Sequence, residues 1–177
     1  YTPALVLRRE YKNERDVLFV MYTKEFGKIG AVAKSARKIT SKVAGHLLLG
    51  RIAGVRVMER SSFQLLDALS NGGQCKHPEL IRLIRFLDDM TPYGQPDPHI
   101  WHLTAEIVRQ CRITPLVYRE LLNILGFAPP RPSALPACVR CKKNEPSTAF
   151  YVPDLVFLCS NCSTDDKIDE NDLVQVV

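Results

Sequence analysis

The sequence lacks the features of membrane proteins and of several common enzyme families. It has no run of 18 apolar residues, so a transmembrane helix is not expected. No charged segment followed by an apolar stretch, the pattern of a secretion leader, is visible. The nucleotide-binding loop G-x-x-x-x-G-K-[ST], the G-x-S-x-G nucleophile turn and the H-E-x-x-H metalloprotease helix are also missing. Without any such signature, or an internal repeat, we expect a protein that is not an enzyme.

Two pairs of cysteines near the C-terminal end are the strongest motif that the chain does have. Cys138 and Cys141 form one C-x-x-C pair, and Cys159 and Cys162 form the other. The spacing matches a four-thiolate zinc site, in which each pair makes a tight turn that aims two sulfurs at one point. A closed site of this kind leaves no position for water, so we expect one zinc ion with a structural role.

The chain between the two pairs has room for one hairpin. The apolar runs 150–152 and 155–158 flank Pro153-Asp154 and predict it. Two disulfides in a secreted domain are the alternative to zinc. The other two cysteines, Cys75 and Cys111, have no C-x-x-C partner, and with the zinc site they indicate a reducing cytoplasm. We expect Cys111 to be a small core residue.

Positive charge is concentrated in the N-terminal part. The first 60 residues carry 13 lysines and arginines against 5 acids, whereas the rest of the chain carries 11 against 14. Such a balance fits a polyanionic partner, of which nucleic acid is the commonest, or a solvated positive face. The acidic residues after Cys162 fit a solvated tail, a partner site, or a segment that folds against the basic loop.

The first part of the chain has the composition of a small β-barrel. Five apolar runs, rich in β-branched residues and separated by turns, predict strands at 4–9, 17–22, 28–34, 52–58 and 63–68. Five strands with one long connection at 35–50 fit a closed barrel of the OB type, although an SH3-like barrel would look similar.

A change of period marks the central part. Helical spacing of apolar residues predicts a helix after His77-Pro78-Glu79, a second from about His99, and a third that begins at Thr114-Pro115. We therefore predict an α+β protein in three parts. These are an OB-type DNA-binding barrel over 1–72, a helical domain over 73–131, and a four-cysteine zinc module with an acidic tail over 132–177.

The densest charge in the predicted barrel lies between residues 24 and 42. This basic segment has a single acid, Glu25, against Lys24, Lys28, Lys34, Arg37, Lys38 and Lys42. A loop of this kind can bind successive phosphates without reading bases. Our candidate nucleic-acid contacts are Lys28, Lys34, Arg37, Lys38 and Lys42, with Arg9 at the end of the first strand. Nearby aromatic residues that can stack on bases are Tyr11, Tyr22 and Phe26, whereas Phe19 is expected in the core.

Several stretches of the barrel resemble the RecO family of bacterial recombination mediators. They are Ala4-Leu5-Val6-Leu7-Arg8-Arg9, Glu14-Arg15-Asp16, Thr23-Lys24-Glu25-Phe26-Gly27-Lys28-Ile29, Ala31-Val32-Ala33-Lys34-Ser35-Ala36-Arg37-Lys38, Ser41-Lys42-Val43-Ala44 and Leu47. The order of barrel, helical region and cysteine module agrees as well. Ser35 stands where the family usually has glycine, so we expect this turn to be less free to adopt a positive φ.

The resemblance implies a non-enzymatic DNA-repair protein. RecO-like proteins bind single-stranded DNA, and double-stranded DNA more weakly, and anneal complementary strands. They partner with RecR, act on DNA coated by single-strand-binding protein, and help RecA to load. Carried over, Lys34, Arg37, Lys38 and Lys42 are DNA contacts and the four cysteines are zinc ligands.

Further expectations concern location and docking. The resemblance implies a cytoplasmic bacterial protein associated with the nucleoid. Family members continue with further helices beyond the point where this chain ends, so we expect docking on single-strand-binding protein to be reduced or absent. The alternative function is a zinc-containing adaptor that binds proteins and has no direct contact with DNA.

Overall fold

The computed structural model describes residues 1–36, 42–70, 72–128, 135–141, 145–165 and 167–177. The chain divides into two compact units, Tyr1–Arg112 and Ile113–Val177. The boundary between them falls inside the stretch 73–131, for which the sequence predicts one helical domain. The three-part division at 72 and 131 therefore remains a prediction. None of the helices in the described part of the chain has the length and apolar character of a membrane span.

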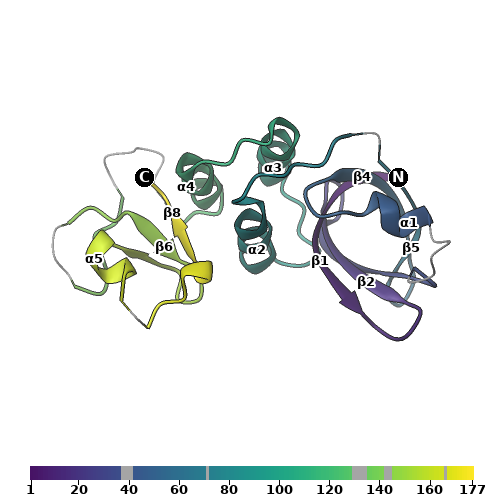
Figure 1. The fold of residues 1–177 in the computed structure, drawn as a ribbon, viewed down its shortest axis with the longest axis horizontal. Coiled ribbons are helices and arrows are strands. Elements are labelled where there is room, and N and C mark those ends of the chain that lie inside the picture. The colour runs from purple at the N-terminus through teal and green to yellow at the C-terminus, as the bar shows by residue number, and fades with distance from the viewer. Residues whose placement is uncertain (37–41, 71, 129–134, 142–144, 166) are drawn as a thin grey trace. The chain divides into compact units, whose positions relative to one another are not determined.

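Five strands of the first unit close into a barrel (Figure 1). They are β1 (Thr2–Tyr11), β2 (Val17–Thr23), β3 (Gly27–Ala33), β4 (Ile52–Glu59) and β5 (Phe63–Leu69). The order is β1-β2-β3-β5-β4, and β4 pairs with β1 to close the ring. Neighbouring strands run antiparallel except β3 and β5, which are parallel. The predicted OB-type barrel is thereby confirmed, and each strand lies within two residues of its predicted range at either end.

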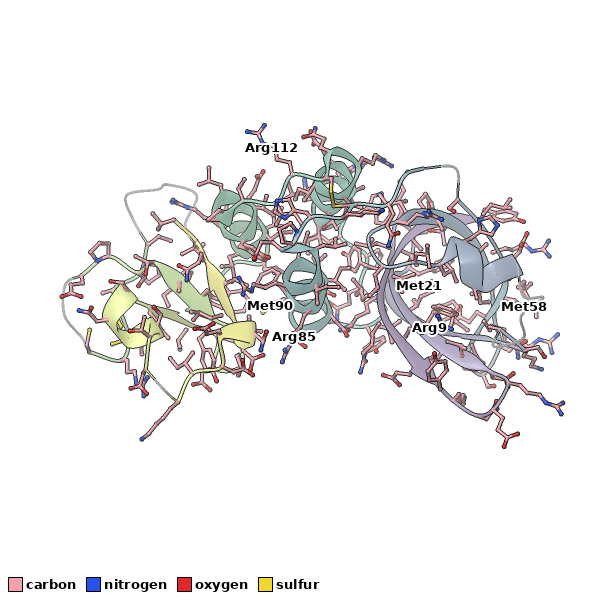
Figure 2. All side chains as sticks on the ribbon, in the orientation of Figure 1. Arg9, Met21, Met58, Arg85, Met90 and Arg112 are labelled. Atoms are coloured by element: carbon pink, nitrogen blue, oxygen red, sulfur yellow. A yellow bond between two sulfur atoms is a disulfide. The ribbon has the colours of Figure 1, made fainter. Side chains whose placement is uncertain are left out.

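Small and branched side chains fill the inside of the barrel. The buried cluster includes Val6, Phe19, Met21, Ala31 and Val55, and Figure 2 labels Met21 among the strands. β1 is buried on both faces over its first half, since Leu5 and Leu7 on its other face are 1% and 5% exposed. Burial on both faces explains why this stretch reads as a continuous apolar run.

A glycine fixes the turn between β2 and β3. Gly27 has a φ of 63°, and a Cβ at this position would lie 2.3 Å from the carbonyl oxygen of Gln95. Only glycine tolerates both the left-handed backbone and so close an approach. The segment that follows helix α2 (Leu80–Met90) can therefore lie directly against the barrel.

A short helix, in a stretch that the sequence predicts as a connection, begins at the last residue of the basic segment. This is α1 (Lys42–His46). Nδ1 of His46, in its last turn, accepts a hydrogen bond from the N–H of Ser70 at 3.2 Å. That bond ties the end of α1 to the end of β5.

Two longer helices complete the first unit, α2 (Leu80–Met90) and α3 (Pro98–Gln110). Asp97 caps α3, because its side chain accepts hydrogen bonds from the N–H groups of His99 and Ile100. Cys75 and Cys111 form a disulfide, seen as the yellow bond in Figure 2. Cys111, expected to be a small core residue, is instead half-buried and bonded to Cys75, because the fold brings together residues whose spacing carries no signal.

The second unit contains a three-stranded sheet and the third helix of the central part, α4 (Pro115–Ile124). The sheet has the order β7-β6-β8 and consists of β6 (Ala149–Tyr151), β7 (Val156–Leu158) and β8 (Leu173–Gln175). β6 and β7 are the predicted hairpin. A single-turn helix, α5 (Ser160–Ser163), follows β7. A 3-10 turn, η2 (Glu170–Asp172), precedes β8.

The acidic tail is not simply a solvated one. Leu173, Val174 and Val176 are 7%, 1% and 0% exposed, and β8 pairs with β6. Acidic side chains such as Asp169 and Glu170 face water, while these three apolar residues extend the core of the second unit. That core includes Phe150, whose ring stacks edge-on against the rings of Phe127 and Phe157.

Candidate metal centre and nucleic-acid interface

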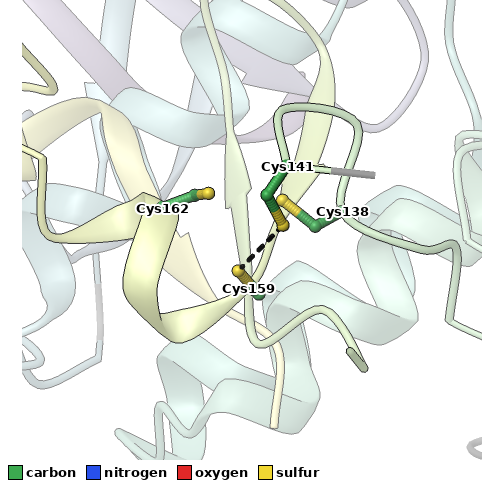
Figure 3. A group of neighbouring side chains, drawn as sticks. All are labelled: Cys138, Cys141, Cys159 and Cys162. Carbon is green, nitrogen blue, oxygen red and sulfur yellow. Dashed lines mark hydrogen bonds between the residues drawn. The ribbon is translucent and has the colours of Figure 1, made fainter. Parts of the chain in front are cut away.

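The local backbone aims the four cysteine sulfurs at one point (Figure 3). Cys138 and Cys141 stand at the ends of a turn, which is fixed to the sheet by the hydrogen bond from the N–H of Val139 to the carbonyl of Phe157. Cys159 directly follows β7 and is the N-cap of α5. Its carbonyl accepts the N–H of Cys162 at 3.1 Å, so the second pair also forms one tight turn.

The spacing of the sulfurs fits a tetrahedral metal ion. All four Sγ atoms lie within 4.8 Å of one another, and those of Cys141 and Cys159 are 3.8 Å apart. Zinc–thiolate bonds of about 2.3 Å in a tetrahedron place the sulfurs about 3.8 Å from each other. The four predicted ligands are therefore brought together in a geometry that can bind a metal ion.

The pKa values of the thiols show that four thiolates need a positive charge at the centre of the site. Burial raises the pKa of Cys138, but hydrogen bonds from the N–H groups of Cys141, Cys159 and Arg140 outweigh it and lower that pKa to about 6. Burial and the neighbouring thiols raise the pKa of Cys162 to about 12. The crowded site cannot hold four negative charges by itself, and a divalent cation at its centre removes this limit.

The surroundings of the cluster indicate a structural role. Cys138 and Cys159 are each 1% exposed and pack against Ala149, Leu158 and Leu173. No histidine or carboxylate joins the four thiols as a further ligand among the described residues. Four sulfurs complete a tetrahedral shell, so a bound ion has no open position at which to activate water.

Strand pairing places two of the predicted nucleic-acid contacts at one end of the barrel. Tyr11 at the end of β1 pairs with Val17, which pairs with Ala33 at the end of β3. Arg9 lies near the end of β1 and is exposed, and its guanidinium carbon is 5.4 Å from the centre of the Tyr11 ring. Lys34 is exposed in the turn that directly follows β3.

Two further cations, which the sequence analysis did not single out, lie in the connection between β1 and β2. Lys12 and Arg15 are exposed there. Together with Arg9 and Lys34 they form what we call the basic end of the barrel. Their signal in the sequence is weak, because single cations beside Glu14 and Asp16 look like an ordinary polar turn.

A hydrogen-bond network fixes the start of the basic segment. The carboxylate of Asp16 accepts the N–H of Ser35 at 2.9 Å and the side-chain amide of Asn13 at 3.0 Å. The N–H of Ser35 and then the amide of Asn13 lower the pKa of Asp16. Ser35 adopts a positive φ of 57° although serine is less free than glycine to do so. The bond to Asp16 holds the residue in that conformation.

Of the other predicted contacts, the structure describes the side chain of Lys28 but not those of Arg37, Lys38 and Lys42. Arg37 and Lys38 lie outside the described residues, and Lys42 begins α1 without a described side chain. Lys28 is 6% exposed, and its ammonium contacts the carbonyl oxygen of Asp88. The prediction that Lys28 contacts nucleic acid does not fit this placement, because a buried and paired ammonium cannot reach a phosphate.

The candidate stacking residues also separate by exposure. Tyr11 is 65% exposed at the basic end, whereas Tyr22 is 1% exposed and its hydroxyl accepts the N–H of Asp97. Phe19 is buried in the core as expected. Phe26 is 38% exposed and packs against Phe63, with 5.6 Å between the ring centres. Tyr11 is therefore the aromatic residue best placed beside the cations.

Comparisons with known proteins agree with this architecture. The family description "Recombination protein O N terminal" matches residues 1–70, which contain the barrel. A protein of Bacillus velezensis named DNA repair protein RecO is 26% identical over 90% of this chain and 67% of its own length. A protein of the same name from Listeria monocytogenes is 27% identical over 93% of this chain and 69% of its own length. The one from Bacillus subtilis is 24% identical over 90% of this chain. The barrel therefore matches the N-terminal part of Recombination protein O, and most of the chain is similar to proteins named DNA repair protein RecO.

Proposed function

We propose that this chain is a recombination mediator without a catalytic centre, which binds single-stranded DNA, and double-stranded DNA more weakly, through the basic end of its barrel. The observation that carries the proposal is the exposure of Arg9 and Lys34 at one end of a closed OB-type barrel that matches the N-terminal part of Recombination protein O. Arg37, Lys38 and Lys42 continue the same segment and add to the positive charge.

Contact with the DNA backbone is electrostatic. Lysine and arginine side chains neutralise phosphates and release counterions, so binding by this surface is independent of base sequence. Tyr11 offers an exposed ring on which a base can stack. Two strands held in this way keep partly exposed bases while their mutual repulsion is reduced, and this favours annealing of complementary strands.

The metal of the four-cysteine site is proposed to be a single structural zinc ion. Four thiolates at tetrahedral spacing are the donor set that zinc prefers, and they stabilise a small unit with a limited core. The zinc holds the turn that contains Cys138 and Cys141 against α5. It takes no part in any reaction.

The partners that the family implies are proposals for this chain as well. They are RecR, RecA during its loading, and DNA coated by single-strand-binding protein. A cytoplasmic, nucleoid-associated location in a bacterial cell follows from binding to DNA. A pure adaptor that binds proteins alone would show no salt-dependent affinity for DNA, and the following experiment separates the two.

The test is fluorescence anisotropy of a labelled single-stranded oligonucleotide at several salt concentrations, with zinc bound. Four or five neutralised phosphates predict a slope of roughly −3 for log K against log salt. Changing Lys34, Arg37, Lys38 and Lys42 together to alanine is expected to remove most of the affinity and to flatten this slope. A folded variant that binds as well as the wild type would overturn the placement of the site.

A control of equal charge makes the result specific. Lys76, Arg85, Arg112 and Lys167 are all exposed and lie outside the barrel. Their joint change to alanine removes the same number of charges without touching the basic end. We expect this control to bind DNA with nearly unchanged affinity. Equal losses in both variants would point to net charge and not to a site.

A further inference from the structure

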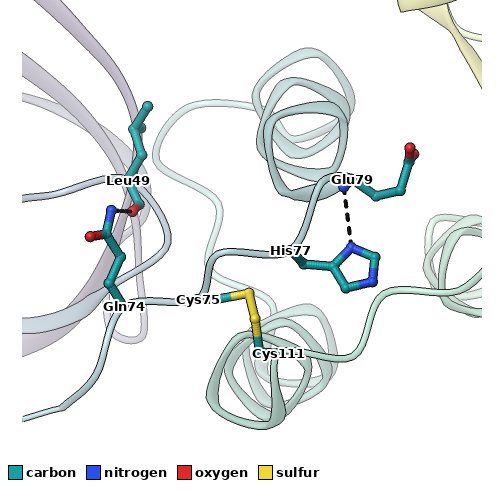
Figure 4. The surroundings of a disulfide bond; sticks show 6 residues. All are labelled: Leu49, Gln74, Cys75, His77, Glu79 and Cys111. Atoms are coloured by element: carbon teal, nitrogen blue, oxygen red, sulfur yellow. Dashed lines mark hydrogen bonds between the residues drawn. A yellow bond between two sulfur atoms is a disulfide. The ribbon is translucent and has the colours of Figure 1, made fainter.

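The disulfide between Cys75 and Cys111 joins the segment that follows the barrel to the C-terminal end of α3 (Figure 4). The two cysteines are 36 residues apart in sequence. Cys75 is 4% exposed, whereas Cys111, the C-cap of α3, is only half-buried. An external reagent therefore meets the Cys111 side of the bond first.

A cavity of about 510 Å³ lies beside this bond. Both cysteines line it, together with Ile52, Gly72, Gly73, Gln74, Val108 and Arg109. The two glycines, Gln74 and Arg109 are exposed, so the cavity opens to solvent on that side. Its volume is in the range that holds a small organic molecule.

The six cysteines of the chain are in two different redox states, four as free thiols and two in a disulfide. The four in the metal centre are free thiols and can bind a metal ion only in the reduced state. Surroundings that keep them reduced also present thiols to any accessible disulfide. Intracellular disulfides, where they occur, are mostly transient or redox-sensing. A disulfide that borders an open cavity in such a chain is placed for exchange.

We infer that the Cys75–Cys111 bond is a reversible thiol–disulfide exchange site for small anionic thiols that enter this cavity. The thiolate of such a molecule attacks Sγ of Cys111, the bond between the two cysteines breaks, and Cys75 leaves as a thiolate that takes a proton from water. A second thiol molecule then attacks the mixed disulfide at the sulfur that came from the first thiol molecule. This step releases Cys111 as a thiolate and one molecule of the oxidised dimer, so two thiols supply the two electrons.

Arg109 gives the site its preference for anions. It lines the cavity and directly precedes the last residue of α3, close in sequence to Cys111. A positive charge beside a disulfide favours the approach of a thiolate and stabilises the thiolates that exchange produces. Neutral thiols gain less from this charge than thiols with carboxylates do.

The bond is mechanically connected to the loop that follows α1. The N–H of Cys75 donates to the carbonyl of Gly50 at 2.8 Å, and the side-chain amide of Gln74 donates to the carbonyl of Leu49 at 2.8 Å. Gly50 has a φ of 73°, and a Cβ there would lie 2.8 Å from the carbonyl oxygen of Cys75. The disulfide thus anchors the segment of Gln74 and Cys75, which is hydrogen-bonded to Leu49 and Gly50. Those two residues lie shortly after the basic segment in the sequence.

Opening of the bond is expected to loosen this anchor and, through it, α1 and the basic segment. Fewer cations are then held in place for phosphate, so the reduced form binds DNA more weakly. This last link rests on the proposed function, whereas the exchange site itself does not.

The first experiment follows the redox state of the two cysteines in the native, metal-loaded protein. The protein is equilibrated with mixtures of reduced and oxidised glutathione, alkylated without unfolding, and mapped by peptide mass spectrometry. We expect Cys75 and Cys111 to pass together from bonded to alkylated as the mixture becomes reducing, while the four metal-site cysteines do not change. A pair that is never bonded, or that reacts only after unfolding, overturns the inference.

The rate of reduction tests the role of Arg109. The Arg109→Ala variant is expected to react about two- to fivefold more slowly with glutathione, a change typical of one lost charge near the surface. Its reaction with neutral 2-mercaptoethanol should be nearly unchanged, and Arg112→Ala, which is also exposed, serves as the matched control. Equal effects on both thiols would remove the proposed preference for anions.

A DNA-binding measurement tests the final link. Oxidised wild-type protein is expected to bind single-stranded DNA about fivefold more tightly than the reduced form, a typical size for coupling between sites. The Cys111→Gly variant cannot form the bond but tolerates the φ of 52° at this C-cap, so it should match the reduced protein in both conditions. Equal affinities of the two forms reject the link to DNA. Absence of binding in both forms rejects the proposed function, and the glutathione titration still decides the exchange site.

Discussion

Lys28 on β3 and Asp88 on α2 form an ion pair in the interior of the first unit. The ammonium nitrogen lies 3.5 Å from one carboxylate oxygen of Asp88, and the two side chains are 7% and 14% exposed. Nε of Arg8 lies 3.1 Å from the other oxygen, and the Lys28 ammonium lies 4.5 Å from the centre of the Tyr93 ring. These contacts join the barrel to the helix beside it, so Lys28 is a structural residue.

The first prediction concerns this pair. Lys28→Ala removes the buried partner of Asp88, which keeps its contact with Arg8, and is expected to lower the free energy of unfolding by about 1–3 kcal/mol. Urea denaturation measures the change. Lys24→Ala, at an exposed position in the turn between β2 and β3, is the control and should stay within about 0.5 kcal/mol of the wild type. A Lys28→Ala protein of normal stability that has lost DNA binding would return Lys28 to the interface.

The barrel could be predicted from the sequence because its signal is local. Apolar runs of strand length with turn residues between them are visible without any knowledge of the fold, as in Val17–Thr23 and Phe63–Leu69. The four metal-site cysteines were equally visible, since C-x-x-C spacing reports a turn. Burial of Lys28 was not, because it depends on which helix the tertiary structure places against β3.

The features that were missed have weak or misleading local signals. α1 has only five residues and includes Gly45, which disfavours a helix. β8 follows a run of acids, which is typical of a solvated segment. The three buried residues Leu173, Val174 and Val176 are too few to give a clear strand signal beside them. Cys75 and Cys111 lie on different elements, and nothing in their spacing indicates that the fold brings them together.

The second prediction concerns removal of the metal. Without a bound cation, the thiols of Cys159 and Cys162 stay protonated and the two turns lose their common anchor. We expect a chelator, or Cys159→Ser, to increase amide exchange throughout the sheet β7-β6-β8. The barrel should keep its protection, because its core cluster shares no residue with this sheet.

Hydrogen exchange followed by mass spectrometry distinguishes the two regions. Asn161→Ala, at an exposed position between Cys159 and Cys162, is the matched control and should not change exchange in the presence of metal. Unchanged protection of the sheet in metal-free protein would show that the apolar contacts of Phe150 and its neighbours are sufficient without an ion.

The third prediction is a pH dependence at Asp16. Its pKa is lowered from the model-compound value of 3.8 in the folded state, chiefly by the N–H of Ser35 and then by Asn13. A lowered folded-state pKa adds stability that is fully present well above 3.8 and is lost as the pH falls through the folded pKa. Acid should therefore release the turn at Lys34 and Ser35 before it unfolds the barrel core.

Carbon-13 NMR of the Asp16 carboxyl group measures this titration directly. The Asp16→Asn variant, which cannot ionise, should show a smaller loss of stability between pH 6 and pH 3 than the wild type. Glu14→Gln, at an exposed position in the same connection, is the control and should retain the wild-type acid sensitivity. A folded-state pKa above 3.8 would contradict the hydrogen bond to Ser35.

The fourth prediction compares two described arginines of the barrel that each lie over a tyrosine ring. Arg9 lies 5.4 Å from the ring centre of Tyr11 at the basic end, and Arg56 on β4 lies 5.9 Å from that of Tyr1. Both guanidinium groups are exposed and cover a ring, so their removal should have similar small effects on stability. Only Arg9 is grouped with Lys34 and the cations of the β1–β2 connection.

Arg9→Ala is therefore expected to weaken the binding of single-stranded DNA and to reduce the salt slope by about 0.7, the value for one lost phosphate contact. Arg56→Ala should leave both quantities unchanged, because Arg56 is opposite Asp67 in the β4–β5 register and outside the basic end. Parallel titrations of the two variants at two salt concentrations give the answer. Equal losses, or a loss confined to Arg56→Ala, would place the DNA on another face of the barrel, since the two variants differ only in which exposed stacked arginine they remove.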